Sequence, residues 1–270
     1  MYPAREVFPS SPLEYVVVEI KYPYAPRLRQ NETRDAILIE LDDLLPIVKP
    51  QPHVTMTGVV GGPVSQQVEQ VPRASNTSRT IGLTVMPNAL TLDTTHYSTF
   101  EEFRLLVTRC LHALGKHTSP AAIERVGLRY VNEVRVPDPI EDVRDWSGWV
   151  ADALVAAATV DSGHLATELQ GAVQYTTGEH RKLTLRFGAV HQGSLIGDGA
   201  LKRREPIKDG PFFFLDLDSY WEPPADESPS WDAEAVMTVI DELHVPVGAM
   251  FQAAITDKLR DSVLRRNPDG

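Results

Sequence analysis

Alternating arginines in one short segment are the most distinctive chemical feature of the sequence. In a β-strand, successive side chains point to opposite faces. One face of this strand would carry Arg125, Gly127, Arg129, Glu133 and Arg135. Guanidinium groups bind carboxylates and phosphates through paired hydrogen bonds, and Gly127 leaves room for such a group. The pattern predicts a ligand-binding face, and the alternative is a solvated face with arginine–glutamate pairs between strands.

The opposite face of the same strand is apolar except at two positions. Val126, Leu128 and Val134 share this face with Tyr130 and Asn132. A phenol and a carboxamide need hydrogen-bond partners when they are buried. Tyr130 and Asn132 therefore bring polar atoms to a side of the strand that otherwise predicts core packing.

Two other predicted strands carry basic residues with the same alternation. Lys182 and Arg186 share one face of residues 182–191, and Glu19 and Lys21 share a face of the first strand. If these strands lie in one concave sheet, their charged faces add to that of Arg125 and Arg129. We therefore take all six side chains as candidate ligand-binding residues for a phosphorylated small molecule or a nucleotide: Arg125, Arg129, Lys182, Arg186, Glu19 and Lys21.

Asp216 and Asp218 are the candidate metal ligands. They fall on one face of a strand, and two carboxylates at this spacing can bind Mg²⁺ together with phosphate oxygens. They can equally pair with Arg129 or Arg186, and no third ligand is placed by the sequence. Magnesium is thus predicted only if the phosphate-binding interpretation holds, and no other cofactor is predicted. The motifs of serine hydrolases, P-loop proteins and dinucleotide-binding proteins do not occur.

Composition limits the classes of partner. The 270 residues carry a formal net charge of −11, which disfavours bulk nucleic-acid binding because phosphate backbones are repelled. Cys110 is the single cysteine, so no internal disulfide can form, and its apolar neighbours indicate a buried structural thiol. No apolar run has the length of a signal peptide or a membrane span. We therefore expect a cytoplasmic protein that does not bind membranes.

Periodicity predicts an α+β fold. Alternation favours long antiparallel hairpins, and helices are expected to pack on one face of the sheet or sheets. The clearest helix begins after Thr99, where Glu101 and Glu102 follow in a capping pattern. Helix is also expected over most of 138–158, and a strand hairpin is expected to turn at 61–63. The chain divides into two similar-sized halves, 1–137 and 138–270, that form one compact unit.

The C-terminal region predicts two amphipathic helices, 231–243 and 247–264, with a break at Pro246. Apolar residues recur along the second helix with helical spacing. This stripe could pack on a protein partner or on a second copy, and the alternative is packing within the chain: Val247, Phe251, Ala254, Ile255, Leu259, Val263 and Leu264.

Four segments together resemble one known family. They are Pro12-Leu13-Glu14 leading into Val18-Glu19-Ile20, Tyr97-Ser98-Thr99-Phe100-Glu101-Glu102-Phe103, Arg125-Val126-Gly127-Leu128-Arg129-Tyr130-Val131-Asn132, and Leu243-His244 through Ile255-Thr256-Asp257. They are similar to the sporadically distributed family of uncharacterised bacterial proteins of about this length. The sequence departs from the family pattern at Val131, where isoleucine is frequent, and near Arg79-Thr80, where tryptophan is frequent.

The resemblance implies a bacterial cytosolic protein of patchy occurrence, and it supplies no functional residues. Patchy occurrence suits a toxin–antitoxin pair, an immunity factor or phage defence. Together with the absence of a catalytic motif, it favours a non-enzymatic protein-interaction component. The alternative function is binding or hydrolysis of a phosphorylated small molecule or nucleotide, with Mg²⁺, on the basic strand face.

Overall fold

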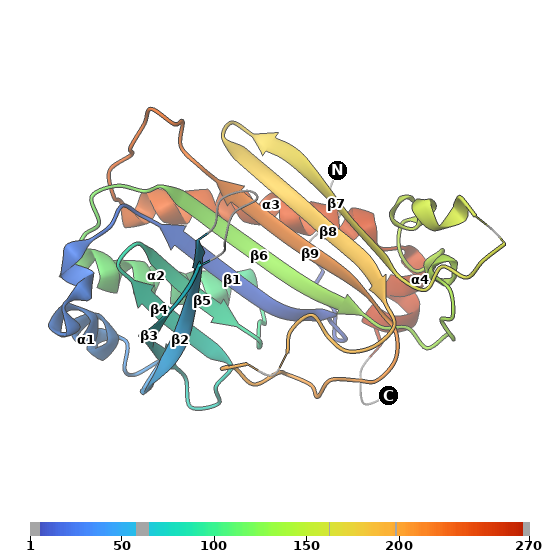
Figure 1. Ribbon diagram of the computed structural model, residues 1–270, viewed down its shortest axis with the longest axis horizontal. Coiled ribbons are helices and arrows are strands. Elements are labelled where there is room, and N and C mark those ends of the chain that lie inside the picture. Colours follow the sequence, from blue (N-terminus) through green and yellow to red (C-terminus); the bar gives the residue numbers. More distant parts are fainter. Residues whose placement is uncertain (1–5, 58–64, 162, 198, 267–270) are drawn as a thin grey trace.

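The computed structural model describes residues 6–57, 65–161, 163–197 and 199–266. Nine strands form one antiparallel sheet in the order β2-β3-β4-β5-β1-β6-β9-β8-β7 (Figure 1). The strands are β1 (Leu13–Lys21), β2 (Ile47–Thr57), β3 (Ser65–Ser75), β4 (Ile81–Met86), β5 (Ala89–Thr94), β6 (Arg125–Val134), β7 (Leu169–Gly178), β8 (Arg181–Val190) and β9 (Phe212–Trp221). The predicted turn at 61–63 lies outside the described residues.

The two halves of the chain follow a similar order of elements, and their strands lie in the same sheet. The first half runs β1, helix α1 (Asn31–Glu40), β2 to β5 and helix α2 (Phe100–His117). The second half runs β6, short helical turns, β7 to β9 and helix α3 (Ala233–Ala254). β1 and β6 pair at the centre, β5 flanks β1, and β9 flanks β6. In this order of elements β6 is the first strand of the second half, whereas the predicted boundary between residues 137 and 138 assigns it to the first half.

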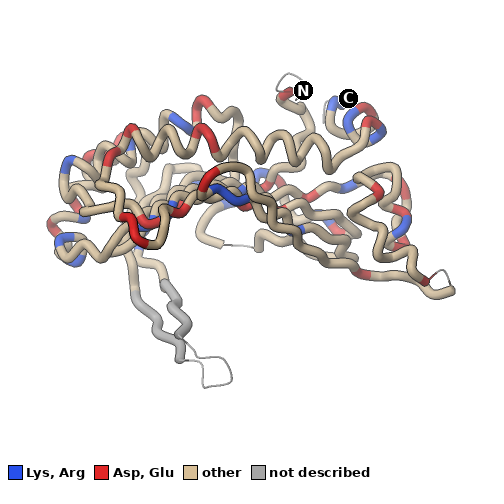
Figure 2. Tube along the Cα trace, turned by 90° about the horizontal axis from the view of Figure 1, so that it is seen from above, with Lys and Arg blue, Asp and Glu red and all other residues tan. Residues whose placement is uncertain are grey.

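Helices cover one face of the sheet. Figure 2 shows α3 extended along this face, and α3 also packs beside α2. Beneath the helices, Val16, Val18 and Ile20 of β1 are fully buried, as their alternation predicts. The α+β prediction is confirmed. None of the described helices combines the length and the apolarity that a membrane crossing needs.

Helix α2 begins where its sequence predicts. The hydroxyl of Thr99 accepts a hydrogen bond of 3.2 Å from the backbone N–H of Glu102. Glu101 and Glu102 lie in the first turn, where negative charge favours the helix dipole. Residues that share one side of this helix, including Phe103, are buried against the sheet.

The prediction of helix over most of 138–158 is wrong. The chain there forms three 3₁₀ turns, Val143–Trp146, Asp152–Leu154 and Ala156–Thr159. Asp142 caps the first turn, and Gly148 adopts a φ of 83°, which a continuous helix does not allow. Trp146 and Trp149 are buried from these turns. The segment therefore buries its two indoles from irregular turns and not along one face of a helix.

The predicted helix break at Pro246 is also wrong. α3 continues through Pro246 and ends at Ala254, and a short helix α4 (Asp257–Leu259) with a π turn (Arg260–Leu264) follows. Proline removes one helical hydrogen bond, but Leu243 and Val247 on either side are buried and hold both halves of the helix on the sheet. The break falls where the hydroxyl of Thr256 caps the next turn.

Candidate functional site

All eight residues predicted from the sequence lie on the face of the sheet that points away from the helices, here called the outer face. The strands β1, β6, β9 and β8 are consecutive neighbours, and their registers align the charged rows. Arg129 lies opposite Asp218, and Arg186 lies opposite Asp216. The tertiary structure therefore brings the basic and the acidic candidates together.

The carboxylates on the outer face are already engaged by the arginines. Asp216 is buried and accepts two hydrogen bonds of 2.7 Å from Arg129. This carboxylate raises the pKa of Arg129. Asp218 lies 3.6 Å from Arg125 and 3.7 Å from Arg186. The geometry matches the structural alternative, in which the aspartates hold the guanidinium groups in place.

The remaining candidates lie at one end of this row. Arg125 also lies 3.3 Å from Glu19, and Lys21 lies 3.5 Å from the same carboxylate. Lys182 lies opposite Tyr220 on the outer face. Within the described parts of the chain, no three histidine, cysteine or acidic side chains are grouped so that they could hold a metal ion.

A recess of about 510 Å³ opens on the outer face beside two of the arginines. Arg129 and Arg186 are each 44 % exposed at its rim. The nearest contacts of the Arg186 guanidinium are long, 3.5 Å to Asp216 and 3.7 Å to Asp218. The other walls are mainly apolar and include Phe214 and Ile196.

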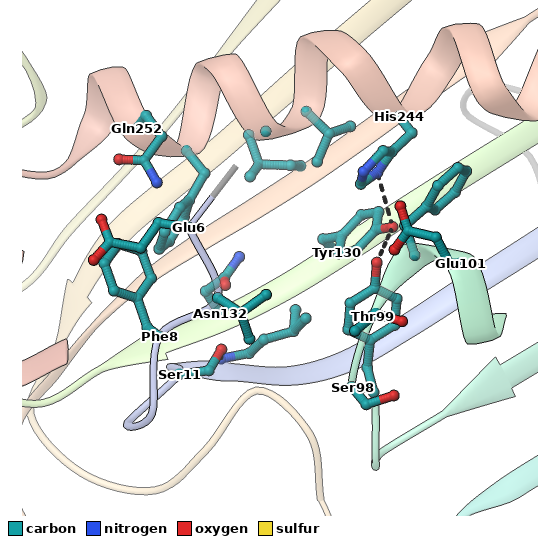
Figure 3. Close-up of a pocket in the computed structure, with 18 of the residues that line it drawn as sticks. Glu6, Phe8, Ser11, Ser98, Thr99, Glu101, Tyr130, Asn132, His244 and Gln252 are labelled. Atoms are coloured by element: carbon teal, nitrogen blue, oxygen red, sulfur yellow. Dashed lines mark hydrogen bonds between the residues drawn. The ribbon is translucent and has the colours of Figure 1, made fainter. Parts of the chain in front are cut away.

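A larger cavity lies on the opposite face, between α3 and the sheet. It has a volume of about 720 Å³ and is here called the helix-face cavity (Figure 3). Its walls come from the N-terminal segment, β1, the start of α2, β6, β9 and α3. The apolar part of the lining consists of Val7, Phe8, Pro9, Leu13, Phe100, Leu217, Val245, Val247, Gly248 and Phe251.

One end of the helix-face cavity carries a row of hydrogen-bonding groups. The hydroxyl of Tyr130 lies 3.2 Å from the hydroxyl of Tyr97 and 3.2 Å from Nδ1 of His244. Figure 3 shows Tyr130 and His244 directed toward one another from β6 and α3. The imidazole of His244 stacks on Phe100, with ring centroids 3.8 Å apart. We call Tyr97, Tyr130 and His244 the polar row.

Asn132 is the second polar residue on this face of β6. Its amide nitrogen donates a hydrogen bond of 3.1 Å to the backbone oxygen of Leu215, and the residue is buried. The bond anchors the side chain while it lines the cavity. The alternation of β6 placed Tyr130 and Asn132 on this face, but it did not predict a cavity there. Phe100 and His244 were not identified, because nothing local links α2 and α3 to that strand.

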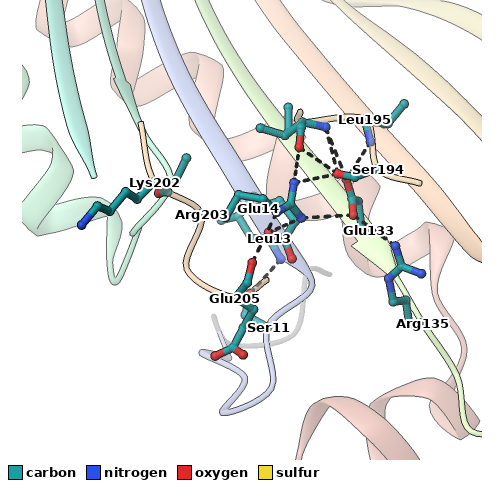
Figure 4. A network of polar contacts seen from close by, with 12 residues as sticks. Ser11, Leu13, Glu14, Glu133, Arg135, Ser194, Leu195, Lys202, Arg203 and Glu205 are labelled. Atoms are coloured by element: carbon teal, nitrogen blue, oxygen red, sulfur yellow. Dashed lines mark hydrogen bonds and ion pairs between the residues drawn. The ribbon is translucent and has the colours of Figure 1, made fainter. Parts of the chain in front are cut away.

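The connection between β8 and β9, residues 191–211, is here called the strap. Adjacent antiparallel strands need only a short turn, whereas the strap extends to the neighbourhood of β5, where Thr95 donates to the backbone oxygen of Lys202. The side chain of Arg203, a strap residue, is buried and pairs with Glu14 at 2.9 Å and Glu133 at 3.3 Å. Figure 4 shows these two carboxylates converging on Arg203 from neighbouring strands.

The strap also lines both the outer recess and the helix-face cavity. Leu195 and Ile196 line the outer recess, and Arg204 lines the helix-face cavity. Burial raises the pKa of Glu14, and the Arg203 guanidinium partly offsets this increase. The ion pairs of Arg203 therefore hold in place a segment that shapes two potential ligand sites.

Burial bears on two other expectations from the sequence, the structural role of Cys110 and the packing of the C-terminal apolar stripe. Cys110 is buried, and burial raises the pKa of its thiol to about 12, so the thiolate form is absent at neutral pH. The apolar stripe of the C-terminal helices packs largely within the chain. Its fully or almost fully buried members are Val247, Ala254, Ile255, Leu259 and Leu264.

The fold and the cavity define a class: an α+β protein with one antiparallel sheet, helices on one face and a ligand-sized cavity between them. Cavities of this volume, with apolar walls and a few convergent polar groups, are typical of small-molecule sites. No family model matches the chain, and no curated protein matches its sequence.

Proposed function

We propose that the protein binds a small molecule in the helix-face cavity. The ligand has a mainly apolar body and one neutral hydrogen-bonding group. The observation that carries this proposal is the polar row at one end of a mainly apolar cavity of about 720 Å³.

The chemistry of the polar row favours a neutral group on the ligand. Two phenols and an imidazole can each donate or accept a hydrogen bond, so they suit a hydroxyl or a carbonyl. A full charge would lose part of its hydration on entering the mainly apolar body of the cavity, although Glu6, Glu101 and Arg204 also line it. Phe8 and Phe251, whose rings lie 6.5 Å apart, offer an apolar wall for the body.

The prediction that tests this proposal uses 1-decanol as a probe. At about 100-fold excess over its dissociation constant, we expect decanol to raise the melting temperature by about 5 °C. Gly248→Leu places a side chain in the cavity from α3 and should abolish this shift. The substitution also favours the helix by up to about 1 kcal/mol, so lost binding would not reflect unfolding.

The matched control is Ala253→Leu, an exposed position on the same helix. It should keep the full decanol shift. Decylammonium and decanoate share the apolar body and test the end group, and both should give smaller shifts than decanol. Tyr130→Phe should weaken decanol binding about fivefold, the effect of one hydrogen bond. An unchanged shift in Gly248→Leu would contradict the proposal.

A second candidate function is supported by the outer recess. The half-exposed guanidinium groups of Arg129 and Arg186 lie at its rim, and Arg186 has only long contacts to Asp216 and Asp218. An anion that approaches from the recess could take up these donors, as the sequence pattern predicts for a phosphorylated molecule.

For this second function, inorganic phosphate and ADP with Mg²⁺ are the probes. We expect a thermal shift in the wild type that Arg186→Ala reduces at least about tenfold in probe affinity, because a charge-assisted contact is lost. The control is Arg104→Ala, another half-exposed arginine that pairs with Asp241 on the helix side. Equal shifts in both variants would rule out a site at Arg186.

A further inference from the structure

The two edge strands of the sheet differ in the features that prevent pairing with another strand. β2 carries Lys49, Pro50 and Pro52, and a proline cannot donate a backbone hydrogen bond. β7 has ten residues, Leu-Gln-Gly-Ala-Val-Gln-Tyr-Thr-Thr-Gly, and none is charged or proline. One edge is therefore blocked by its sequence, and the other is not.

β7 is also accessible. In the described chain β8 is the one strand that pairs with it, and Figure 1 shows β7 at the border of the sheet. Val173 and Tyr175 are 42 % and 38 % exposed, although their partners on β8, Leu185 and Leu183, are buried. The apolar row of the sheet thus continues onto an edge that faces solvent. Exposed uncharged edges of this length are templates for strand addition.

We propose that β7 pairs antiparallel with β7 of a second copy about a twofold axis, which joins the two sheets into one. The net charge of −11 makes two copies repel one another, so an interface between them requires a neutral or complementary strip. β7 is such a strip. An antiparallel strand is complementary to itself, whereas β2 with its prolines cannot complete the same ladder.

The side chains of β7 indicate a register. With Val173 on the axis, Val173 lies opposite its own copy, and Tyr175 lies opposite Gly171. A Cβ atom added to Gly171 would lie 2.5 Å from the Phe187 ring, so that ring already occupies the space beside the glycine. In this register the Tyr175 ring of the second copy packs beside Phe187, and no charged side chains face each other.

The test is sedimentation of the full chain at concentrations up to about 100 μM. We expect a dimer for the wild type and a shift toward monomer for Val173→Lys, with the dissociation constant raised about tenfold by the loss of the valine pair and the two opposed lysines. Val48→Lys is the matched control, because Val48 is an exposed valine on the other edge strand, and it should leave the dimer intact. A wild-type monomer across this range would overturn the proposal.

Crosslinking checks the register and does not depend on the stability of a charged variant. Val173→Cys should form a disulfide between copies under mild oxidation, because residues opposite each other across an antiparallel pair lie about 5 Å apart. Val48→Cys should remain reduced, and the native Cys110 is buried. A dissociation constant that Val173→Lys leaves unchanged, or equal crosslinking of both cysteine variants, would place the interface elsewhere. None of these outcomes depends on ligand binding in the helix-face cavity.

Discussion

Replacing Arg203 with methionine is expected to lower the free energy of unfolding by about 3–5 kcal/mol at neutral pH. The side chain of Arg203 is 7 % exposed and is paired with Glu14 and with Glu133, whose side chain is 1 % exposed. Without the guanidinium, the buried Glu133 and the partly buried Glu14 remain close together with much of their compensating charge removed. The strap would also lose its attachment to β1 and β6. Urea unfolding followed by circular dichroism measures the loss.

The loss of unfolding free energy caused by Arg203→Met should become smaller as the pH falls. The pKa of Glu14 is raised by burial in the folded protein, and Arg203 opposes that increase, so the variant raises it further. A carboxyl whose folded pKa lies above its unfolded value favours folding when protonated. That contribution is complete below the ordinary value of 4.5 and is lost as the pH rises through the folded pKa. The difference from wild type should therefore be smaller at pH 4.5 than at pH 7.

Two variants separate this effect from a general loss of surface charge. Arg109→Met removes an exposed pair in which Arg109 binds Asp43 through bonds of 2.8 and 2.9 Å, and it should cost less than about 1 kcal/mol. Glu14→Gln in the Arg203→Met background should restore part of the stability, because one buried charge is gone. If Arg203→Met cost no more than Arg109→Met, the buried pairing would not matter.

Trp146→Ala is expected to cost about 3–5 kcal/mol, the range for truncating a buried aromatic side chain. Trp146 is 1 % exposed, and its ring packs on that of Phe213 in β9 at a centroid distance of 5.5 Å. It anchors a segment of 3₁₀ turns that has few regular hydrogen bonds of its own. Hydrogen exchange should show faster exchange in residues 142–160 of the variant than in the rest of the chain.

Two substitutions act as controls for Trp146→Ala. Trp146→Phe keeps an aromatic ring against Phe213 and should lose clearly less stability. Val160 lies on the same segment but is 90 % exposed, so Val160→Ala should change the free energy of unfolding by no more than about 0.5 kcal/mol. A loss below about 1 kcal/mol in Trp146→Ala would show that the segment is held by other contacts.

Local sequence was sufficient for the first strand and for the start of α2, because the determinants of each lie within a few residues of one another. The alternation of Val16, Val18 and Ile20 predicted both the strand and its buried face. The cap at Thr99 predicted the start of α2. At Pro246 the same reasoning gave a wrong result, because buried contacts on both sides of the proline outweigh one lost hydrogen bond.

For the candidate sites, the sequence by itself determined which side chains share a face of a strand, since that depends on a period of two residues. It placed Arg129 and Asp216 on charged faces, and Tyr130 on an apolar one. Only the tertiary structure decided that Arg129 binds Asp216 and that Tyr130 meets His244 on α3. Such partners are remote in sequence, and strand order and helix packing, which minimise the free energy of the whole chain, determine which of them come into contact.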